Sequence, residues 1–304
     1  MISSAVNLKQ LEAFVAVVDL GTFRNAARHL NTTQPNISSR IARLESNLGV
    51  VLLHRDAGSV RLTRKGAALL ISARDVLWAT EALIEKANRT DLIEDKLRLG
   101  VTELVACTWL HEYLRQLHDA YPAVSVELTV NLSREIDKDL AEGQLDLAVQ
   151  TAPFSTNLSE VRGLGGYPYQ WVAAPEIAQD LQEGESLARM SVFSFLTHVR
   201  HTSAPTALSE RLRKEGLTTA RVVHNSSLTS CMQMAIDRMG VALLPATLVA
   251  EDVAAGRLHV VACNWHPEPL EFYVRYDRKR VPRYVRAAAD LAIEVCKADA
   301  AALG

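Results

Sequence analysis

The chain has 304 residues, of which 48% are apolar and 22% charged, and its formal net charge is −2. This composition is typical of a globular protein of about two or three domains, and it excludes a mainly disordered or collagen-like chain. No apolar run approaches the roughly 18 residues that cross a bilayer, the first residues lack a secretory signal, and four separate cysteines are too few for a disulfide scaffold. We therefore expect a cytoplasmic protein with no membrane partner.

The small net charge hides an uneven distribution along the chain. Residues 1–66 contain nine Lys and Arg against four Asp and Glu, which gives +5 and leaves −7 for the remaining residues. A basic segment on an acidic body indicates a nucleic-acid contact at one end. Charge alone leaves chance clustering on a small domain as an alternative.

Three helices are predicted in residues 1–66. The first has apolar residues at helical spacing and ends at Gly21. Thr22 is a good N-cap for the second helix and Thr33 for the third, which has Pro35 in its first turn. Two short helices joined by a tight turn are typical of a helix-turn-helix.

The third helix has an apolar face and an opposite polar face. Ile37, Ile41 and Leu44 recur at i, i+4 and i+7 and are expected to face the core. Asn and Gln pair with adenine, Arg pairs with guanine, and Ser contacts base edges or phosphates. An ordinary solvated helix face is the alternative. The candidate DNA-contacting residues of this helix are Thr33, Gln34, Pro35, Asn36, Ser38, Ser39, Arg40 and Arg43.

A short hairpin is predicted after the third helix, with its turn at Asp56-Ala57-Gly58-Ser59. A hairpin beside a recognition helix forms a wing. Arg55, Arg61 and Arg64 would then reach the DNA backbone or the minor groove.

Short motifs follow one another from Phe14 to Gly66. They are Gly21-Thr22-Phe23, Ala26-Ala27, Leu30, Gln34-Pro35, Ile37-Ser38, Ile41, Leu44-Glu45, Leu48-Gly49-Val50, Leu53, Arg55 and Leu62-Thr63-Arg64-Lys65-Gly66. Their order and spacing resemble the DNA-binding domain of LysR-type transcriptional regulators (LTTRs). The family often has a basic residue where this chain has Ser39, and here the arginine is the next residue, Arg40.

A long helix without proline is predicted from Gly66 to about Asp91, and we place a linker and dimerisation helix at residues 67–93. Its apolar spacing predicts pairing with the same helix of a second subunit, whereas packing on its own domain is the alternative. In the family this helix joins two subunits, so the resemblance implies a dimer that reads two half-sites, and a tetramer of two dimers. The heptad positions are Leu69, Ala73, Val76, Thr80, Leu83 and Ala87.

Residues 95–304 alternate predicted strands and helices, which indicates α/β lobes with parallel sheets. The loop at Gly163-Leu164-Gly165-Gly166 is interpreted as a linker between two lobes. The last strand and helix are expected to return to the first lobe. We therefore place lobe I at about residues 95–162 plus 268–304, and lobe II at about 163–267.

This region resembles the effector domain of the same family, which has a type 2 periplasmic-binding-protein fold. The matches are Leu97-Arg98-Leu99-Gly100, Pro122, Gly143-Gln144-Leu145-Asp146-Leu147-Ala148 and Gly240-Val241-Ala242-Leu243-Leu244-Pro245. The resemblance implies an α/β protein with an N-terminal winged helix-turn-helix (residues 1–66), a linker helix and a two-lobed effector domain (residues 95–304).

Ligands of open α/β sheets bind beyond the carboxyl ends of strands, beside helix N-termini. In the family, hydroxyl residues after the first strand commonly hold the effector, which implies this role for Thr102. Helix-end amides and hydroxyls suit a small carboxylate or other anion, and simple helix capping is the alternative. The candidate effector-binding residues are Thr102, Gln150, Thr151, His198, His201, Thr202, Ser227 and Thr229.

Enzymatic motifs such as GxSxG, HExxH and GxGxxG do not occur, and the nine histidines lack metal-ligand spacing. We therefore expect no enzyme, no metal and no cofactor. Cys231 opens a predicted helix whose dipole would lower its pKa, which makes a redox-sensing thiol an alternative to a buried inert one. A solute-binding protein or enzyme with the same two lobes is a further alternative, but it leaves residues 1–66 unexplained.

The sequence therefore predicts a sequence-specific LysR-type regulator controlled by a small-molecule co-inducer. Its expected partners are double-stranded promoter DNA and further copies of itself, and RNA polymerase is a further candidate partner.

Overall fold

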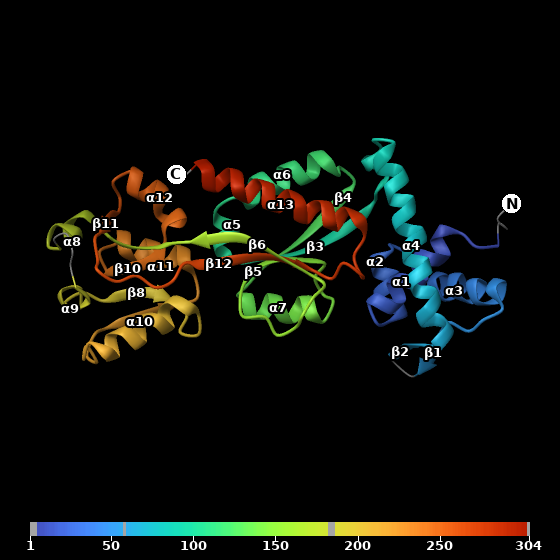
Figure 1. The fold of residues 1–304 in the computed structure, drawn as a ribbon, viewed down its shortest axis with the longest axis horizontal. Coiled ribbons are helices and arrows are strands. Elements are labelled where there is room, and N and C mark those ends of the chain that lie inside the picture. The colour runs from blue at the N-terminus through green and yellow to red at the C-terminus, as the bar shows by residue number, and fades with distance from the viewer. Residues whose placement is uncertain (1–4, 57–58, 182–185, 303–304) are drawn as a thin grey trace.

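The computed structural model describes residues 5–56, 59–181 and 186–302. Figure 1 shows an elongated molecule with the N-terminal helices at one end and two sheet-containing lobes beyond them. Within the described residues, no helix is both long and apolar enough to cross a membrane.

The N-terminal domain contains three helices and a two-stranded wing, as the sequence predicts. Thr22 Oγ1 accepts the Asn25 N–H at 3.1 Å, and Thr33 Oγ1 accepts the Asn36 N–H at 3.4 Å, so both predicted N-caps are confirmed. The predicted hairpin turn includes Ala57 and Gly58, which lie outside the described residues. The elements are α1 (Leu8–Asp19), α2 (Phe23–His29), α3 (Gln34–Leu48), β1 (Leu53–Asp56) and β2 (Ser59–Leu62).

A separate apolar core holds this domain together. Phe14 and Val17 of α1 pack with Ile37 and Ile41 of α3, and all four are fully buried. The apolar face predicted for α3 is therefore turned toward the core, and its polar face is turned outward.

The linker helix α4 spans Arg64–Lys86 and ends earlier than the sequence predicts. Asn88 adopts φ +54°, in the left-handed region that stops a helix, and only the short 3-10 helix η1 (Thr90–Leu92) follows. The heptad positions divide between two environments. Ala73 is buried in the N-terminal core, whereas Val76 and Leu83 are exposed.

Lobe I is built on a five-stranded sheet in the order β4-β3-β5-β12-β6. Figure 1 shows α6 and α13 on one face of this sheet and α7 on the other. The strands are β3 (Asp95–Val101), β4 (Val124–Val130), β5 (Leu147–Thr151), β6 (Glu160–Tyr167) and β12 (Leu270–Tyr276). The helices are α5 (Glu103–Cys107), α6 (Leu110–Ala120), α7 (Ser133–Ala141) and α13 (Arg283–Ala302).

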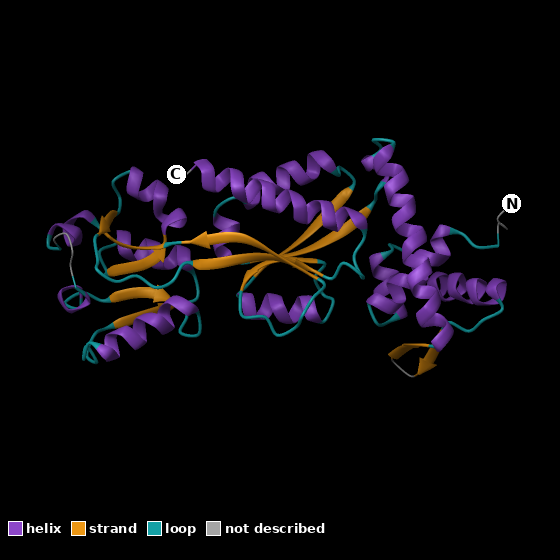
Figure 2. Ribbon diagram, viewed as in Figure 1, coloured by secondary structure: helices purple, strands orange, loops and turns teal. Residues whose placement is uncertain are grey.

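Lobe II is built on a second five-stranded sheet, in the order β11-β7-β10-β8-β9. Figure 2 shows helices on both faces of its strands. The strands are β7 (Tyr169–Ala173), β8 (Phe195–His198), β9 (Val222–Asn225), β10 (Val241–Pro245) and β11 (His259–Val261). The helices are α8 (Pro175–Gln179), α9 (Leu187–Met190), α10 (Ser203–Lys214), α11 (Leu228–Ile236) and α12 (Ala246–Ala254).

The sheets differ from the sequence-based expectation in two respects. Both are mixed rather than parallel, because β12 runs antiparallel to β5 and β6, and β7 runs antiparallel to β10 and β11. The predicted loop at Gly163–Gly166 is wrong, since these residues lie in β6 and pair with β12. Glycines weaken a strand signal in the sequence, but here the long β12 supplies the pairing partner.

Candidate DNA-binding surface and effector region

The polar face of α3 is accessible along most of its length. Gln34, Pro35, Asn36, Ser39 and Arg43 are exposed, as is the capping Thr33, while Ser38 and Arg40 are half-buried. The exposed side chains of this face are of the types that contact base edges and phosphates.

The wing adds further cationic side chains beside α3. Arg61 in β2 and Arg64 at the start of α4 are exposed. Arg55 lies in β1, and its side chain lies outside the described part of the chain. Within the described residues Arg43, Arg61 and Arg64 take part in no ion pair, so their charges are available to an external anion.

The start of α11 in lobe II is bridged to lobe I by a carboxylate. Glu103, the first residue of α5, accepts hydrogen bonds from Ser227 Oγ at 2.8 Å, Leu228 N–H at 2.7 Å and Thr229 N–H at 3.2 Å. The Thr229 hydroxyl donates a fourth hydrogen bond to Glu103 at 3.0 Å. Two predicted effector residues, Ser227 and Thr229, thus have their donors turned to a carboxylate of the same chain.

The pKa of Glu103 lies below its usual value. Burial alone would raise this pKa, but the hydrogen bonds from Leu228, Ser227 and Thr229 stabilise the charged form and outweigh it. Glu103 is therefore an anion bound at a helix N-terminus. Glu103 is not among the residues predicted to bind the effector, and its signal in the sequence is its position directly after Thr102.

The other candidate effector residues occupy different surroundings. Thr102 Oγ1 is buried and forms no hydrogen bond within the described residues. Gln150 is fully buried inside lobe I and donates to Asp137 at 3.3 Å. Thr151 bonds to the Ser133 hydroxyl at 2.9 Å, beside this interior network.

The histidine loop lies at the carboxyl end of β8. His198 Nε2 is 3.2 Å from the carbonyl oxygen of Ser226, and burial lowers the pKa of His198. His201 is exposed. Thr202 precedes α10 and donates to the Val199 carbonyl at 2.9 Å, so it does not cap that helix through its side chain.

Cys231 does not have the lowered pKa that its place near a helix N-terminus predicts. It is 1% exposed and donates to the Thr197 carbonyl at 3.3 Å. Burial raises the pKa of Cys231 to about 11, and the charge of Glu103 adds to this effect. Burial, the larger cause, therefore outweighs any lowering by the helix dipole, and these surroundings favour the buried inert thiol over the redox-sensing alternative. Cys107 is exposed, and its Sγ lies 3.6 Å from Thr229 Oγ1.

The two parts of the chain match two family models. Residues 8–67 match the bacterial regulatory helix-turn-helix protein, lysR family, and residues 90–297 match the LysR substrate binding domain. Together these matches include the winged domain and both lobes.

Several known proteins are similar to the chain over most of its length. It is 30% identical over 257 residues to a "Probable hydrogen peroxide-inducible genes activator" of Streptomyces viridosporus, an alignment that covers 83% of this chain and 82% of that protein. It is 27% identical over 304 residues to "HTH-type transcriptional activator AaeR" of Escherichia coli (strain K12), covering 95% of both proteins.

A solved structure has the same fold. The crystal structure of ArgP from Mycobacterium tuberculosis covers 94% of this chain and 96% of its own, with a TM-score of 0.58 and 25% identity. The matched family models, the relatives and the fold agree, and the chain belongs to the LysR family of transcriptional regulators.

Proposed function

We propose that this LysR-type regulator binds promoter DNA in a sequence-specific manner through α3 and the wing. The observation that carries the proposal is the exposed polar face of α3, which includes Arg43, together with Arg61 and Arg64 nearby. None of these three arginines forms an ion pair within the described residues. Arginines without an internal partner lose no ion pair on contact with phosphate. We assign residues 1–66 to the DNA-binding domain, residues 67–93 to the linker helix and residues 95–304 to the effector-binding domain.

The test is fluorescence anisotropy with a labelled fragment of the promoter next to the gene, across a salt series. Binding through several phosphates makes the logarithm of affinity fall linearly with the logarithm of salt concentration. A scrambled fragment of equal length is the control for sequence specificity. Absence of salt-dependent binding to the promoter fragment contradicts the proposal.

The proposed effector is a small carboxylate or related anion that acts as co-inducer. Its support is the set of donors at the start of α11, which already hold the carboxylate of Glu103. An anionic effector would bind there by replacing Glu103 and so would release the contact between the lobes. A thermal-shift screen of metabolites tests this, because a ligand of the folded state raises the melting temperature.

The proposed assembly is a dimer through α4 and a tetramer of two dimers, acting in the cytoplasm on promoter DNA. Val76 and Leu83 lie seven residues apart on α4, and 45% and 69% of their surfaces are exposed. A second exposed apolar row, Val126, Leu128 and Val130, lies on edge strand β4. Mass photometry of a Leu83→Glu variant tests the proposed dimer contact through α4. An oligomer mass equal to that of the unchanged protein contradicts this contact.

A further inference from the structure

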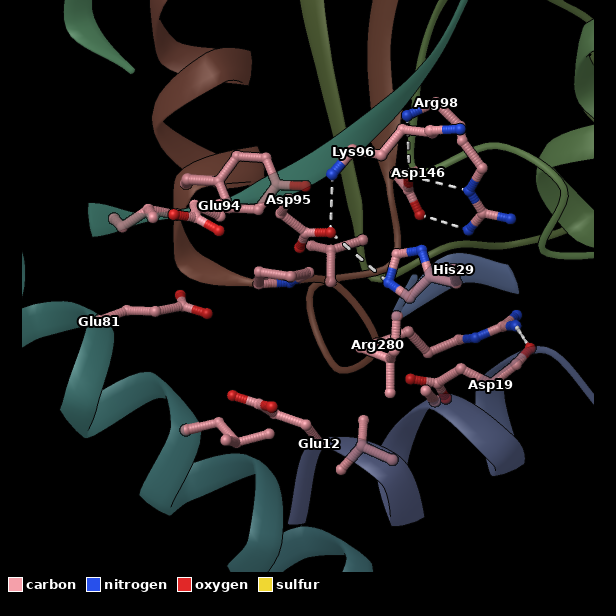
Figure 3. A pocket seen from close by; sticks show the side chains of 18 of the residues that line it. Glu12, Asp19, His29, Glu81, Glu94, Asp95, Lys96, Arg98, Asp146 and Arg280 are labelled. Atoms are coloured by element: carbon pink, nitrogen blue, oxygen red, sulfur yellow. Dashed lines mark hydrogen bonds and ion pairs between the residues drawn. The ribbon is translucent and has the colours of Figure 1, made fainter. Parts of the chain in front are cut away.

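The N-terminal domain and lobe I meet around a hollow of about 900 Å³ (Figure 3). Its walls come from α1, α2, α4, the start of β3 and the segment that follows β12. Ionisable side chains from both sides line this hollow, among them Glu12, His29, Glu81, Asp95 and Arg280. Ile84 of α4 packs against the apolar core of lobe I, and polar contacts at the rim of the hollow add specific links between the two parts.

The first group of rim contacts joins α4 to residues 277–286, which we call the junction segment. The indole N–H of Trp78 donates to the Val281 carbonyl at 3.1 Å. Glu81 accepts the backbone N–H of Arg283 at 2.5 Å, so a side chain of the linker helix caps the first turn of α13.

Two arginines of the junction segment complete this group. The Arg283 guanidinium pairs with the carboxylate of Glu85 at 2.9 Å. The Arg286 guanidinium stacks over the ring of Trp78, 4.4 Å from its centre. Hydrogen bonds, an ion pair and a cation–π contact therefore act on α4 within two turns of helix.

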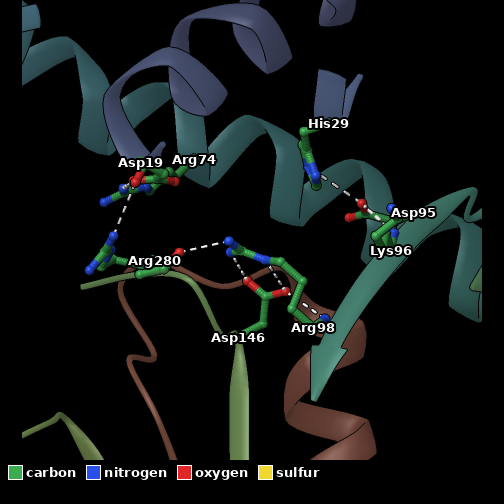
Figure 4. Close-up of polar contacts among 9 residues, drawn as sticks. Asp19, His29, Arg74, Asp95, Lys96, Arg98, Asp146 and Arg280 are labelled. Atoms are coloured by element: carbon green, nitrogen blue, oxygen red, sulfur yellow. Dashed lines mark hydrogen bonds and ion pairs between the residues drawn. The ribbon is translucent and has the colours of Figure 1, made fainter. Parts of the chain in front are cut away.

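The second group joins the junction segment and β3 to the winged domain itself (Figure 4). Arg280 donates to the Asp19 carbonyl at the end of α1, at 3.2 Å, and its guanidinium lies against Gly143, where a Cβ would come within 2.4 Å of Nη2. His29 of α2 lies 3.5 Å from the carboxylate of Asp95. Asp19 is also paired with Arg74 of α4, so Asp19 contacts both α4 and the junction segment.

The covalent connection between α4 and β3 offers much less restraint. Residues 86–89 are exposed, and Asn88 has a left-handed backbone. Arg89 pairs with Asp91 two residues away, a contact that fixes only the local turn. A connection of this kind sets how far apart the two parts lie more than how they are oriented.

We propose that the junction segment sets the orientation of the winged domain relative to lobe I within one subunit, with Arg280 and Arg283 as positioning residues. The segment continues β12 directly, and β12 pairs with β5 and β6 of the lobe I sheet. A movement of this sheet is therefore applied to α4 and α1 through Arg283 and Arg280.

The test measures the orientation without DNA or effector, so its outcome is independent of the proposed function. Spin labels at Arg24→Cys on α2 and Asp119→Cys on α6, both exposed positions, report one interdomain distance by double electron–electron resonance. The background carries Cys107→Ser and Cys263→Ser, while Cys231 and Cys296 are buried. Dilution with unlabelled chain isolates the distance within one subunit.

The intact junction is expected to give a single narrow distance distribution. The double variant Arg280→Ala/Arg283→Ala is expected to at least double its width, whereas the charge-matched control Arg211→Ala/Arg213→Ala on α10 leaves it unchanged. Salt at 1 M, where the Debye length is about 3 Å, is also expected to widen the distance distribution of the protein with the intact junction, because it screens the ion pairs.

An equally narrow distribution in the double variant, or a broad one with the junction intact, overturns the proposal. Circular dichroism and the melting temperature establish that the variants are folded. If the double variant fails to fold, Trp78→Phe removes the hydrogen bond to Val281 and weakens the stacking of Arg286, and the same broadening is then expected to a smaller extent.

Discussion

The carboxylate of Glu103 and the hydroxyl of Ser227 lie 2.8 Å apart, and this hydrogen bond links lobe I to lobe II across 124 positions of sequence. Glu103 also accepts the N–H groups of Leu228 and Thr229. The start of α11 is therefore an anion site that the chain itself fills, and emptying it has measurable consequences.

Glu103→Ala is expected to lower the melting temperature by several degrees. Hydrogen bonds to a charged group contribute about 1.5–3 kcal/mol, and the freed donors at Ser227 and Leu228 lose their partner. Added acetate at millimolar concentration is expected to recover part of this loss by binding the empty site. Scanning calorimetry with and without acetate measures both effects.

The control for acetate binding is Glu135→Ala, which removes an exposed glutamate of α7. Acetate is expected to have the same small effect on this variant as on the unchanged protein. An acetate effect on Glu135→Ala equal to that on Glu103→Ala contradicts a specific anion site at α11.

Arg43→Ala is expected to weaken binding to promoter and scrambled duplexes alike and to reduce the salt slope by about one unit if Arg43 contacts a phosphate. This expectation rests on the exposed guanidinium of Arg43, which forms no ion pair within the described residues. Fluorescence anisotropy over a salt series provides the measurement, with Arg211→Ala on α10 as the charge-matched control. If a single base position loses discrimination instead, Arg43 is a base reader. No change in either quantity removes Arg43 from the interface.

The sequence was most informative where the signal is local. Thr22 and Thr33 cap their helices as predicted because a cap depends on residues three positions apart. Glu103 has no comparable signal, since its partners lie more than 120 residues away. The prediction of a loop in glycine-rich β6 is wrong for the same reason, because the strand conformation depends on pairing with the distant β12.

The contacts between α4 and the junction segment also have no local signal in the sequence. The heptad pattern of α4 predicts one apolar seam, but Ala73 of this seam packs in the N-terminal core while Val76 and Leu83 are exposed. Trp78 and Glu81, which lie outside the heptad positions, bind the junction segment. Periodicity identifies which residues share a helix face, but it carries no information on what that face contacts.

Cys231 is expected to react with iodoacetamide at pH 7 at least 100-fold more slowly than Cys107. Burial raises the pKa of Cys231 to about 11, so the reactive thiolate is rare, and the side chain is 1% exposed. Mass spectrometry of alkylated peptides over time gives both rates in one sample.

Cys231→Ala is also expected to leave DNA binding unchanged before and after exposure to hydrogen peroxide. The relevant comparison is the promoter affinity of the two proteins under each condition. A peroxide response that disappears in Cys231→Ala would favour the redox-sensing alternative instead.

Glu81 is expected to make stability fall as pH rises from about 4.5 to about 7. Burial raises the pKa of Glu81 to about 7, and the charges of Asp95 and Glu85 add to this, while the N–H of Arg283 opposes it. The folded state therefore holds a proton that the unfolded state releases in this window, which lowers stability by at most about 3 kcal/mol above pH 7.

Glu81→Gln tests this because a neutral amide still accepts the Arg283 N–H but does not ionise. The variant is expected to match the unchanged protein near pH 4.5 and to exceed its melting temperature above pH 7. Glu210→Gln on the exposed face of α10 is the control and should follow the unchanged protein. If the melting temperatures of Glu81→Gln and of the unchanged protein change with pH in the same way from pH 4.5 to above pH 7, Glu81 is not the group that causes the loss of stability.

Arg275→Met is expected to cost about 3–5 kcal/mol of unfolding free energy because it leaves the buried carboxylate of Asp137 without its cation. Arg275 is fully buried, pairs with Asp137, donates to the Thr156 carbonyl at 2.6 Å and stacks over Phe154. Urea titration followed by circular dichroism measures the change.

Two comparisons separate the loss of the ion pair from the loss of packing. The double variant Arg275→Met/Asp137→Asn is expected to recover part of the lost stability, since it removes the unpaired charge while keeping similar volumes. Arg115→Met breaks an exposed ion pair on α6 and is expected to cost no more than about 1 kcal/mol. A cost for Arg275→Met no larger than that for Arg115→Met would mean that Asp137 is stabilised without Arg275, through its hydrogen bonds to Ser155.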